Sequence, residues 1–287
     1  MPEKVKIIEC PRDAMQGIKS FIPTERKIAY IQSLLGCGFD TIDFGSFVSP
    51  RAIPQMADTA EVLSNLDLTN SKSKLLAIVA NVRGANEASL HHNIDYLGYP
   101  FSISENFQMR NTHKTIAQSI NILSDILEIA QATNKEVVTY VSMGFGNPYG
   151  DPWSVEVVGE WTEKLAEMGA RILSLSDTVG SSTPEDISYL FTHLIPKYPQ
   201  VEFGAHLHTT PGKWHEKIDA AYKAGCRRFD GAIKGFGGCP MARDELTGNM
   251  PTEKMLSYFT ENKVDTGVQW MVFEAAYNKA SELFSSY

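Results

Sequence analysis

Short runs of β-branched and aromatic residues recur along the chain, and segments with helical hydrophobic spacing lie between most of them. The eight strand-like runs are residues 5–9, 41–44, 75–79, 94–97, 137–142, 171–175, 201–206 and 228–232. The helical segments are residues 24–35, 113–133, 152–168, 184–198 and 213–224. Strands that alternate with helices form parallel sheets, so we expect an α/β fold, a (β/α)8 TIM barrel. An open doubly wound sheet is the alternative.

The ends of the repeats are less uniform than their centres. Gly36, Gly38, Gly169 and Gly225 follow helical runs, where a left-handed residue commonly ends a helix. In the stretch 80–105 the pattern predicts the fourth strand only weakly. After the eighth strand we expect a glycine-rich segment, a capped helix from about Thr252 and an amphipathic helix over 265–283. No low-complexity linker divides the chain, so residues 1–287 are expected to form one catalytic domain.

Composition excludes several classes of protein. The chain has 287 residues, 43% apolar content and a formal net charge of -8, with no basic run, which argues against a nucleic-acid partner. The start of the chain does not resemble a leader, and no apolar stretch approaches membrane-spanning length. The cysteines are widely spaced and form no CxxC pair: Cys10, Cys37, Cys226 and Cys239. We therefore expect a cytoplasmic protein with reduced thiols and no membrane association.

Reactive side chains gather where the predicted strands end, which is where barrel enzymes carry their active sites. These residues are Arg12, Asp13, Asp43, Ser104, Glu105, Asp177, His206, His208, Cys239 and Asn249. Each has a structural alternative, such as a helix cap for Asp43 or Asp177 and a surface ion pair for Arg12. Their shared face of the barrel favours the functional interpretation.

The pair His206 and His208 indicates a metal site. Residues two apart on a strand point to the same side, so both imidazoles would face one ion. Asp13 would add a carboxylate and Asn249 an amide oxygen. Such a nitrogen and oxygen set suits Mg²⁺ or Mn²⁺ better than Zn²⁺.

Two further groups are candidates for the chemistry. The guanidinium of Arg12 would stabilise an enolate oxygen that develops during carbon–carbon cleavage. The segment 235–240 is glycine-rich and would bring the thiol of Cys239 over a substrate as an acid or base. A free cysteine is more often an inert apolar residue, which is the alternative for Cys239.

The motifs resemble those of the 3-hydroxy-3-methylglutaryl-CoA lyase family, within the barrel metallolyases that include isopropylmalate and citramalate synthases. The residues that carry the resemblance over nearly the whole chain are Pro11-Arg12-Asp13 with Gln16, Ser46-Phe47-Val48-Ser49-Pro50, Pro54-Gln55-Met56, Ser176-Asp177-Thr178, His206-Leu207-His208, and 235–240 followed by Gly248-Asn249. The Ser-Phe-Val-Ser-Pro and Pro-Gln-Met segments are similar to the lyase branch specifically.

The resemblance implies a homodimeric barrel that cleaves an acyl-CoA substrate to acetoacetate and acetyl-CoA, without an organic cofactor. It implies a divalent metal held by Asp13, His206, His208 and Asn249. The catalytic residues would be Arg12, Cys239, Asp43 and Asp177, and the substrate contacts would come from Gln16, Lys19, Ser104, Tyr140 and Thr178.

The chain also departs from the family pattern. The family usually has Glu at the position of Asp43, Asp at Thr209 and Arg at Val138. Its glycine after Arg-Asp is Ala14 here, and a family cysteine is replaced within 146–148. These differences leave open a related hydroxyacyl-CoA as substrate, a condensing acyltransferase of the synthase type, or a non-catalytic ligand-binding barrel.

Overall fold

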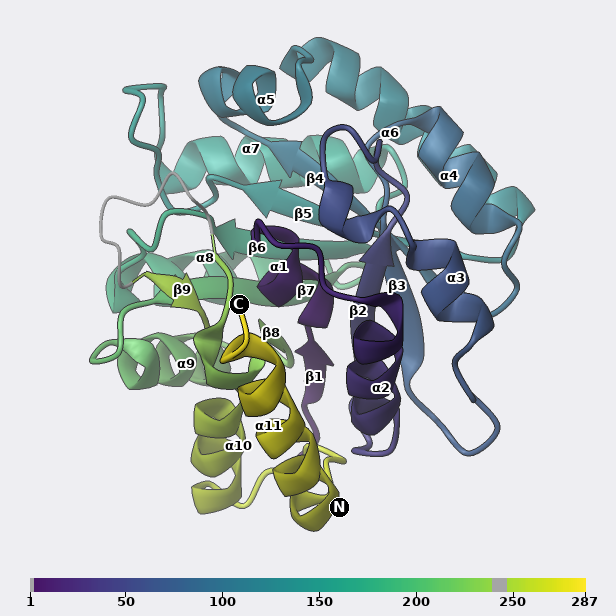
Figure 1. Ribbon diagram of the computed structural model, residues 1–287. Coiled ribbons are helices and arrows are strands. Elements are labelled where there is room, and N and C mark those ends of the chain that lie inside the picture. The colour runs from purple at the N-terminus through teal and green to yellow at the C-terminus, as the bar shows by residue number, and fades with distance from the viewer. Residues whose placement is uncertain (1–2, 239–246) are drawn as a thin grey trace.

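The computed structural model describes residues 3–238 and 247–287, and its centre is a closed barrel of eight parallel strands (Figure 1). The strands are β1 (Lys6–Glu9), β2 (Thr41–Ser46), β3 (Lys74–Ile78), β4 (Tyr96–Ser102), β5 (Glu136–Ser142), β6 (Ile172–Asp177), β7 (Glu202–Thr209) and β8 (Arg228–Gly231). Each pairs with its sequence neighbours, and β1 pairs with β8. The expected barrel is therefore confirmed, and the open sheet is wrong.

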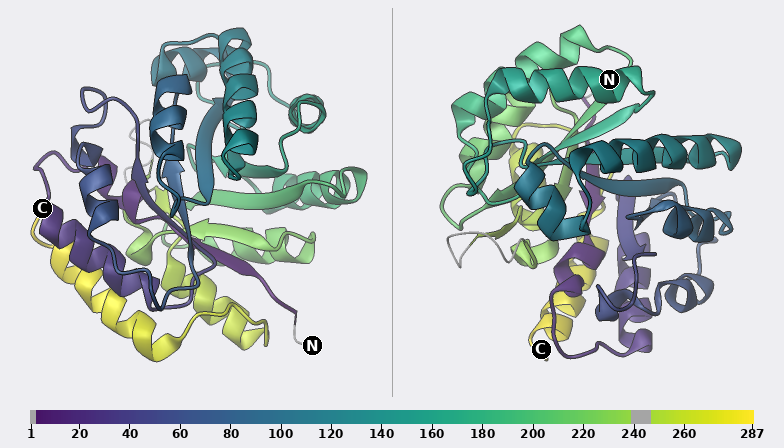
Figure 2. Two further views of the ribbon diagram at one scale, coloured as in Figure 1. Left: turned by 90° about the vertical axis from the view of Figure 1, so that its right-hand side faces the viewer. Right: turned by 90° about the horizontal axis from the view of Figure 1, so that it is seen from above.

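Helices lie around the outside of the barrel and, in the case of the short helix after β1, at its mouth (Figure 1). They are α1 (Pro11–Gln16), α2 (Thr24–Leu35), α3 (Thr59–Ser64), α4 (Val82–Ser89), α5 (Glu105–Thr112), α6 (Ile116–Ala132), α7 (Val155–Glu167), α8 (Pro184–Lys197), α9 (Trp214–Lys223), α10 (Thr252–Glu261) and α11 (Trp270–Phe284), with 3-10 turns η1 (Pro54–Met56) and η2 (Ile233–Gly235). The C-terminal helix α11 lies beside α2 (Figure 2). Within the described residues, no helix has both the length and the apolar character needed to cross a membrane.

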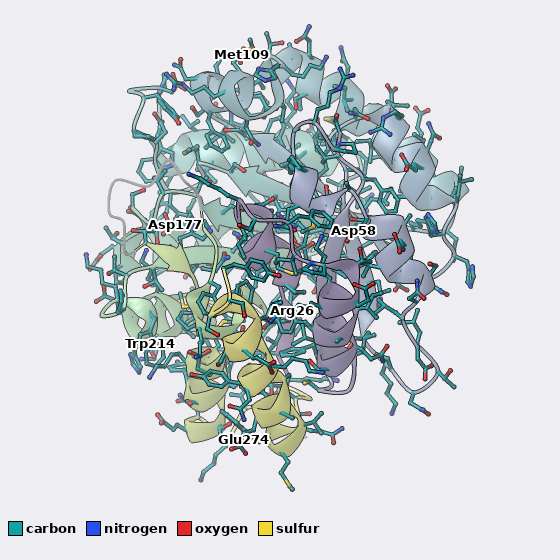
Figure 3. All side chains as sticks on the ribbon, in the orientation of Figure 1. Arg26, Asp58, Met109, Asp177, Trp214 and Glu274 are labelled. Atoms are coloured by element: carbon teal, nitrogen blue, oxygen red, sulfur yellow. The ribbon has the colours of Figure 1, made fainter. Side chains whose placement is uncertain are left out.

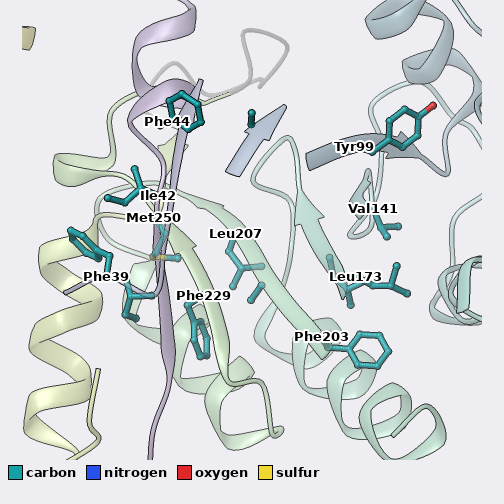
Figure 4. Packing of buried hydrophobic residues seen from close by; sticks show 14 of the residues in the cluster. Phe39, Ile42, Phe44, Tyr99, Val141, Leu173, Phe203, Leu207, Phe229 and Met250 are labelled. Carbon is teal, nitrogen blue, oxygen red and sulfur yellow. The ribbon is translucent and has the colours of Figure 1, made fainter. Parts of the chain in front are cut away.

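Two apolar layers hold the barrel together. The larger layer fills the space between strands and helices and includes Leu173, Phe203 and Phe229 (Figure 4). The smaller layer consists of Leu76, Ile78, Tyr96, Val138, Tyr140 and Ile172. Alternate residues of a strand point to opposite faces, so the two layers use alternate positions. The polar residues of the site extend from the same strands.

A short antiparallel strand, β9 (Gly248–Asn249), returns the chain to the barrel after the eighth strand. It pairs with the end of β7, so that Asn249 lies opposite His208. This pairing joins two sequence motifs that are 41 positions apart. It explains how a residue beyond the last barrel strand reaches the mouth of the barrel.

Several expectations about element boundaries need correction. Arg12 and Asp13 follow the first strand as expected, but they lie in a short helix that was not predicted, α1, because Pro11 at its first position favours helix initiation. The stretch 80–105 contains α4, which Asn81 caps, and its strand starts at Tyr96.

The predicted helix over 113–133 is α6, which begins three residues later, at Ile116, because His113 adopts a left-handed conformation (φ 56°) that ends the preceding helix α5. The last helix begins at Trp270, not at residue 265. Gly38, Gly169 and Gly225 have positive φ as expected, whereas Gly36 is right-handed.

Replacing Leu173 with alanine tests the larger apolar layer. Leu173 is fully buried on β6, so Leu173→Ala should lower the free energy of unfolding by about 3 kcal/mol through lost burial and the cavity left behind. Leu90→Ala is the matched control, because Leu90 is 84% exposed and should change stability by less than about 0.5 kcal/mol. Urea unfolding followed by circular dichroism measures both, and equal midpoints for the two variants would contradict this packing.

Candidate active site

A cavity of about 340 Å³ opens at the carboxyl ends of the strands. Its polar side is formed by Arg12, Asp13 and Gln16 from α1, His206 and His208 from β7, and Tyr140, Ser142, Ser176 and Thr178 from β5, β6 and the turn after β6. Its apolar side is formed by Val48, Ala52, Ile53, Ile78, Ala80, Pro100 and Phe107. The cavity is therefore divided between a group of charged and ligating residues and a wall that accepts carbon-rich groups.

Asp13, His206 and His208 meet at this cavity. One ligand atom from each lies within 4.8 Å of the others. Both histidines project from the same face of β7, as their spacing of two predicts, and their ring centroids are 5.3 Å apart. The predicted convergence of these residues is confirmed.

The hydrogen bonds of His208 leave one nitrogen available as a ligand. Its Nδ1 is 3.0 Å from the main-chain carbonyl of Thr178, and since a carbonyl only accepts, Nδ1 carries the proton. The other ring nitrogen, Nε2, is buried and has no hydrogen-bond partner within residues 3–238 and 247–287. Burial and the neighbouring His206 lower the pKa of His208 to about 4. A neutral imidazole with a free buried lone pair is suited to bind a metal ion.

His206 is oriented by a carboxylate that the sequence analysis did not identify. Its Nδ1 lies 3.1 Å from Oδ2 of Asp230, which projects from β8. Burial lowers the pKa of His206, but the hydrogen bond to Asp230 and the charge of that carboxylate raise the pKa by more. The net result is a pKa above the ordinary value of histidine. A carboxylate on Nδ1 directs Nε2 toward a metal, an arrangement found in many metalloproteins.

Asp13 is held as a carboxylate by several donors. Arg12 Nη1 and Gln16 Nε2 contact its Oδ1 at 3.0 Å and 2.6 Å. Asn249 donates its amide to Oδ2 at 2.7 Å. Burial raises the pKa of Asp13, but Arg12 and the two histidines lower it by more, so the net shift is downward. The acid is therefore ionised and able to bind a cation.

A second cluster, Cys10 with His206 and Asp230, also satisfies metal-ligand spacing. Burial and nearby carboxylates raise the pKa of Cys10 well above its ordinary value, so its sulfur stays protonated. The Sγ atom of Cys10 also donates to the carbonyl of Ile8. The cluster of Asp13 and the two histidines therefore offers the more suitable set of ligand atoms for a cation.

Arg12 is fixed before any substrate arrives. Its Nε lies 3.0 Å from Oδ2 of Asp43, its Nη2 contacts the same oxygen, and Nη1 contacts Asp13. Burial raises the pKa of Asp43 to about 6, although Arg12 opposes that shift. Asp43 is not among the cavity-lining residues, so in this structure its contact is with Arg12 rather than with the cavity.

Tyr140, Thr178 and Gln16 line the cavity as expected of substrate contacts, whereas other predicted residues lie elsewhere. Asp177 is fully buried and paired with Lys217, and Figure 3 labels its position. Ser104 caps α5 and donates to Asp151, while Lys19 is exposed and outside the cavity lining. Cys239 lies outside the described residues.

The departures from the family pattern have local explanations. Val138 is buried in the smaller apolar layer, where it packs with Tyr140 and Ile172. Thr209 is buried and donates its hydroxyl to the carbonyl of Thr210. In the segment that replaces the family cysteine, Asn147 accepts from the main chain of Asp151, which in turn holds the start of α5. That loop therefore supports one wall of the cavity.

Comparisons with known proteins agree with this geometry. A family model described as HMGL-like matches residues 4–278. The hydroxymethylglutaryl-CoA lyase YngG of Bacillus subtilis is 33% identical over 93% of this chain and 89% of its own length.

Two solved structures are also similar. An HMG-CoA lyase from Brucella melitensis superimposes with a TM-score of 0.91 and 32% identity, covering 98% of this chain and 99% of that one. An HMG-CoA lyase from Acinetobacter baumannii, in complex with coenzyme A and 3-methylmalate, gives a TM-score of 0.89 at 29% identity, covering 98% and 92%.

The carboxylate behind His206 should set the pH dependence of metal binding. A proton on Nε2 competes with the metal, so Mn²⁺ affinity should fall by about tenfold per pH unit below the raised pKa of His206. Asp230→Asn removes the interactions that raise this pKa and leaves the burial that lowers it. In the variant, Mn²⁺ affinity should therefore begin to fall at a lower pH. At pH 8 the variant should bind Mn²⁺ more weakly than the original chain by roughly tenfold or more, because the carboxylate that orients His206 is lost. Calorimetric titration with Mn²⁺ from pH 5.5 to 8 measures this, and superimposable pH profiles would refute the assignment.

Proposed function

Because the chain belongs to the HMGL-like family, we propose that it cleaves 3-hydroxy-3-methylglutaryl-CoA, or a closely related hydroxyacyl-CoA, to acetoacetate and acetyl-CoA. The observation that carries the proposal is the buried Nε2 of His208, which has no hydrogen-bond partner among the described residues, in a cluster with Asp13 and His206 at a cavity that also contains Arg12. The complex of the Acinetobacter lyase with coenzyme A supports an acyl-CoA as the substrate class.

Asp13, His206 and His208 would hold a divalent cation, with Asn249 as the proposed fourth group. An oxygen and nitrogen donor set without thiolate favours Mg²⁺ or Mn²⁺ over Zn²⁺. Such an ion, when bound, polarises substrate oxygens and makes a hydroxyl proton more acidic. Asn249 supports the set by donating to Asp13 and to the carbonyl of Phe236, which ties β9 to the mouth of the barrel.

Arg12 would stabilise the charge that develops during cleavage. The bond between the two substrate carbons breaks as the hydroxyl proton leaves, and the electron pair moves into the thioester to form an enolate. Asp43 and Asp13 already fix the guanidinium, so little reorganisation is needed when this charge appears. A prearranged donor of this kind binds the charged oxygen of the transition state more strongly than the neutral oxygen of the ground state.

Two proton transfers complete the reaction. One takes the hydroxyl proton to a base of the cavity, for which we propose the carboxylate of Asp13. The other protonates the enolate carbon to give acetyl-CoA. We propose Cys239 for this second step because it directly follows Gly238, a cavity-lining residue. Asp43 contributes through Arg12.

The remaining parts of the substrate would contact the rest of the cavity. Tyr140, Thr178 and Gln16 offer hydrogen-bonding groups, while the apolar wall accepts the carbon skeleton. Lys19 is exposed beside α1 and is proposed only for the phosphates of coenzyme A. We further propose one catalytic domain over residues 1–287, a homodimer and a cytoplasmic location.

Release of acetoacetate from 3-hydroxy-3-methylglutaryl-CoA tests the proposal. Purified protein with Mg²⁺ or Mn²⁺ should release it, and a chelator should abolish the release. His206→Ala should lose activity together with Mn²⁺ binding. Consumption of acetyl-CoA with a 2-oxo acid would instead indicate a condensing acyltransferase, and bound metal without turnover of any hydroxyacyl-CoA would indicate a non-catalytic barrel.

A second variant separates Arg12 from the metal ligands in the same assay. Arg12→Gln should lower kcat by roughly 10²–10³ while Mn²⁺ binding persists, because the guanidinium acts on developing charge. Arg227→Gln is the matched control, since Arg227 pairs with Glu3 at an exposed site. Unchanged turnover in Arg12→Gln would remove Arg12 from the mechanism.

A further inference from the structure

A buried lysine lies directly behind the metal-ligand histidine. Lys217 projects from α9, and only 1% of its side chain is exposed. Its Nζ donates to three oxygens, namely Oδ2 of Asp177 at 2.7 Å, the carbonyl of His208 at 2.8 Å and the carbonyl of Gly180 at 3.2 Å. An ammonium group has three donors, so every one of them is used.

These acceptors belong to the two segments that position His208. The carbonyl of His208 is on β7, while Asp177 ends β6 and Gly180 follows in the next turn. Thr178, in that same turn, accepts the bond from Nδ1 of His208. Lys217 thus restrains both the main chain of His208 and the segment that orients its ring.

Both carboxylate oxygens of Asp177 are engaged by protein donors away from the cavity. Its Oδ1 accepts from the main-chain N–H of Ser182 at 3.1 Å, and its Oδ2 accepts from the hydroxyl of Ser182 and from Lys217. Its side chain is fully buried and does not line the cavity. In the described part of the chain, Asp177 is the carboxylate that pairs with Lys217. These contacts fit a counterion better than an acid or base.

We propose that Lys217 is a positioning residue for His208, and that Asp177 acts as its counterion. The pair would hold Nε2 of His208 toward Asp13 and His206, so that the site is arranged before an ion binds. This inference rests on the proposed metal site. The same geometry explains why a lysine tolerates this burial, since a charge removed from water needs a partner and filled hydrogen bonds.

Mn²⁺ affinity of Lys217→Met tests the proposal. Loss of the ammonium should raise the dissociation constant for Mn²⁺ by about tenfold or more, because outer partners of metal ligands commonly contribute that much. Activity should recover at high Mn²⁺ concentration with little change in KM for the substrate. Electron paramagnetic resonance of free Mn²⁺ measures the affinity in the folded protein, without turnover.

Lys27→Met is the matched control for the loss of a buried ion pair. Lys27 lies in α2 and is 2% exposed. Its Nζ is 2.8 Å from Oδ1 of Asp58, the residue just before α3. Asp58 and Asp177 lie well apart in Figure 3. Lys27→Met should therefore lower the midpoint of thermal unfolding, as Lys217→Met does, and leave Mn²⁺ affinity within twofold of the original.

A double variant keeps the test decisive if Lys217→Met does not fold. Combining Lys217→Met with Asp177→Asn removes both charges of this pair, so neither is left buried without its partner, and it still removes the donor to His208. The dissociation constant of this double variant for Mn²⁺ should also rise about tenfold. Affinity within twofold of the original chain in the folded variants would overturn the inference alone, whereas failure of the original chain to bind Mn²⁺ would overturn the proposed metal site itself.

Discussion

The Nδ1 atom of His208 donates to the carbonyl of Thr178, and the Nδ1 atom of His206 faces Asp230 across 3.1 Å. These two contacts engage Nδ1 of both rings and so decide which ring nitrogens remain as possible ligands, and one nitrogen of each ring lies within 4.8 Å of an oxygen of Asp13. The barrel makes both contacts possible, because β7 is hydrogen-bonded to β6 on one side and β8 on the other. Closure of the sheet thus controls the chemistry at its mouth through the tautomers of two side chains.

Charge balance is the second constraint. Arg12 lies between Asp43 and Asp13, and Lys217 lies beside Asp177, so each of these two buried cations has a carboxylate within hydrogen-bonding distance. Removing one partner would leave the other uncompensated in a region of low dielectric. The same pairings hold side chains in one orientation. At this site the contacts that make burial of charge tolerable also prearrange the groups for binding and catalysis.

The sequence predicted those features that depend on local periodicity. The strands, the long helices and the convergence of His206 with His208 follow from spacing alone. Asp230 and Lys217 were missed because their roles depend on contacts with β7 that span 24 and 9 positions and on the direction of a side chain. Asp177 was taken for a catalytic group because its position at a strand end is correct, but its side chain is directed toward Lys217 and Ser182. The stretch 80–105 was poorly predicted because its helix has only eight residues and contains Gly84, and because Gly98 and Pro100 interrupt the pattern of its strand.

The central claim is that Asp13, His206 and His208 form one site for a divalent cation at the mouth of the barrel. Anomalous diffraction from crystals soaked in Mn²⁺ tests it directly. We expect one strong peak between the Asp13 carboxylate and the Nε2 atoms of both histidines, with ligand distances of roughly 2.0–2.3 Å. A peak on the side of His206 that faces Cys10 and Asp230, or no peak in this cavity, would contradict the account.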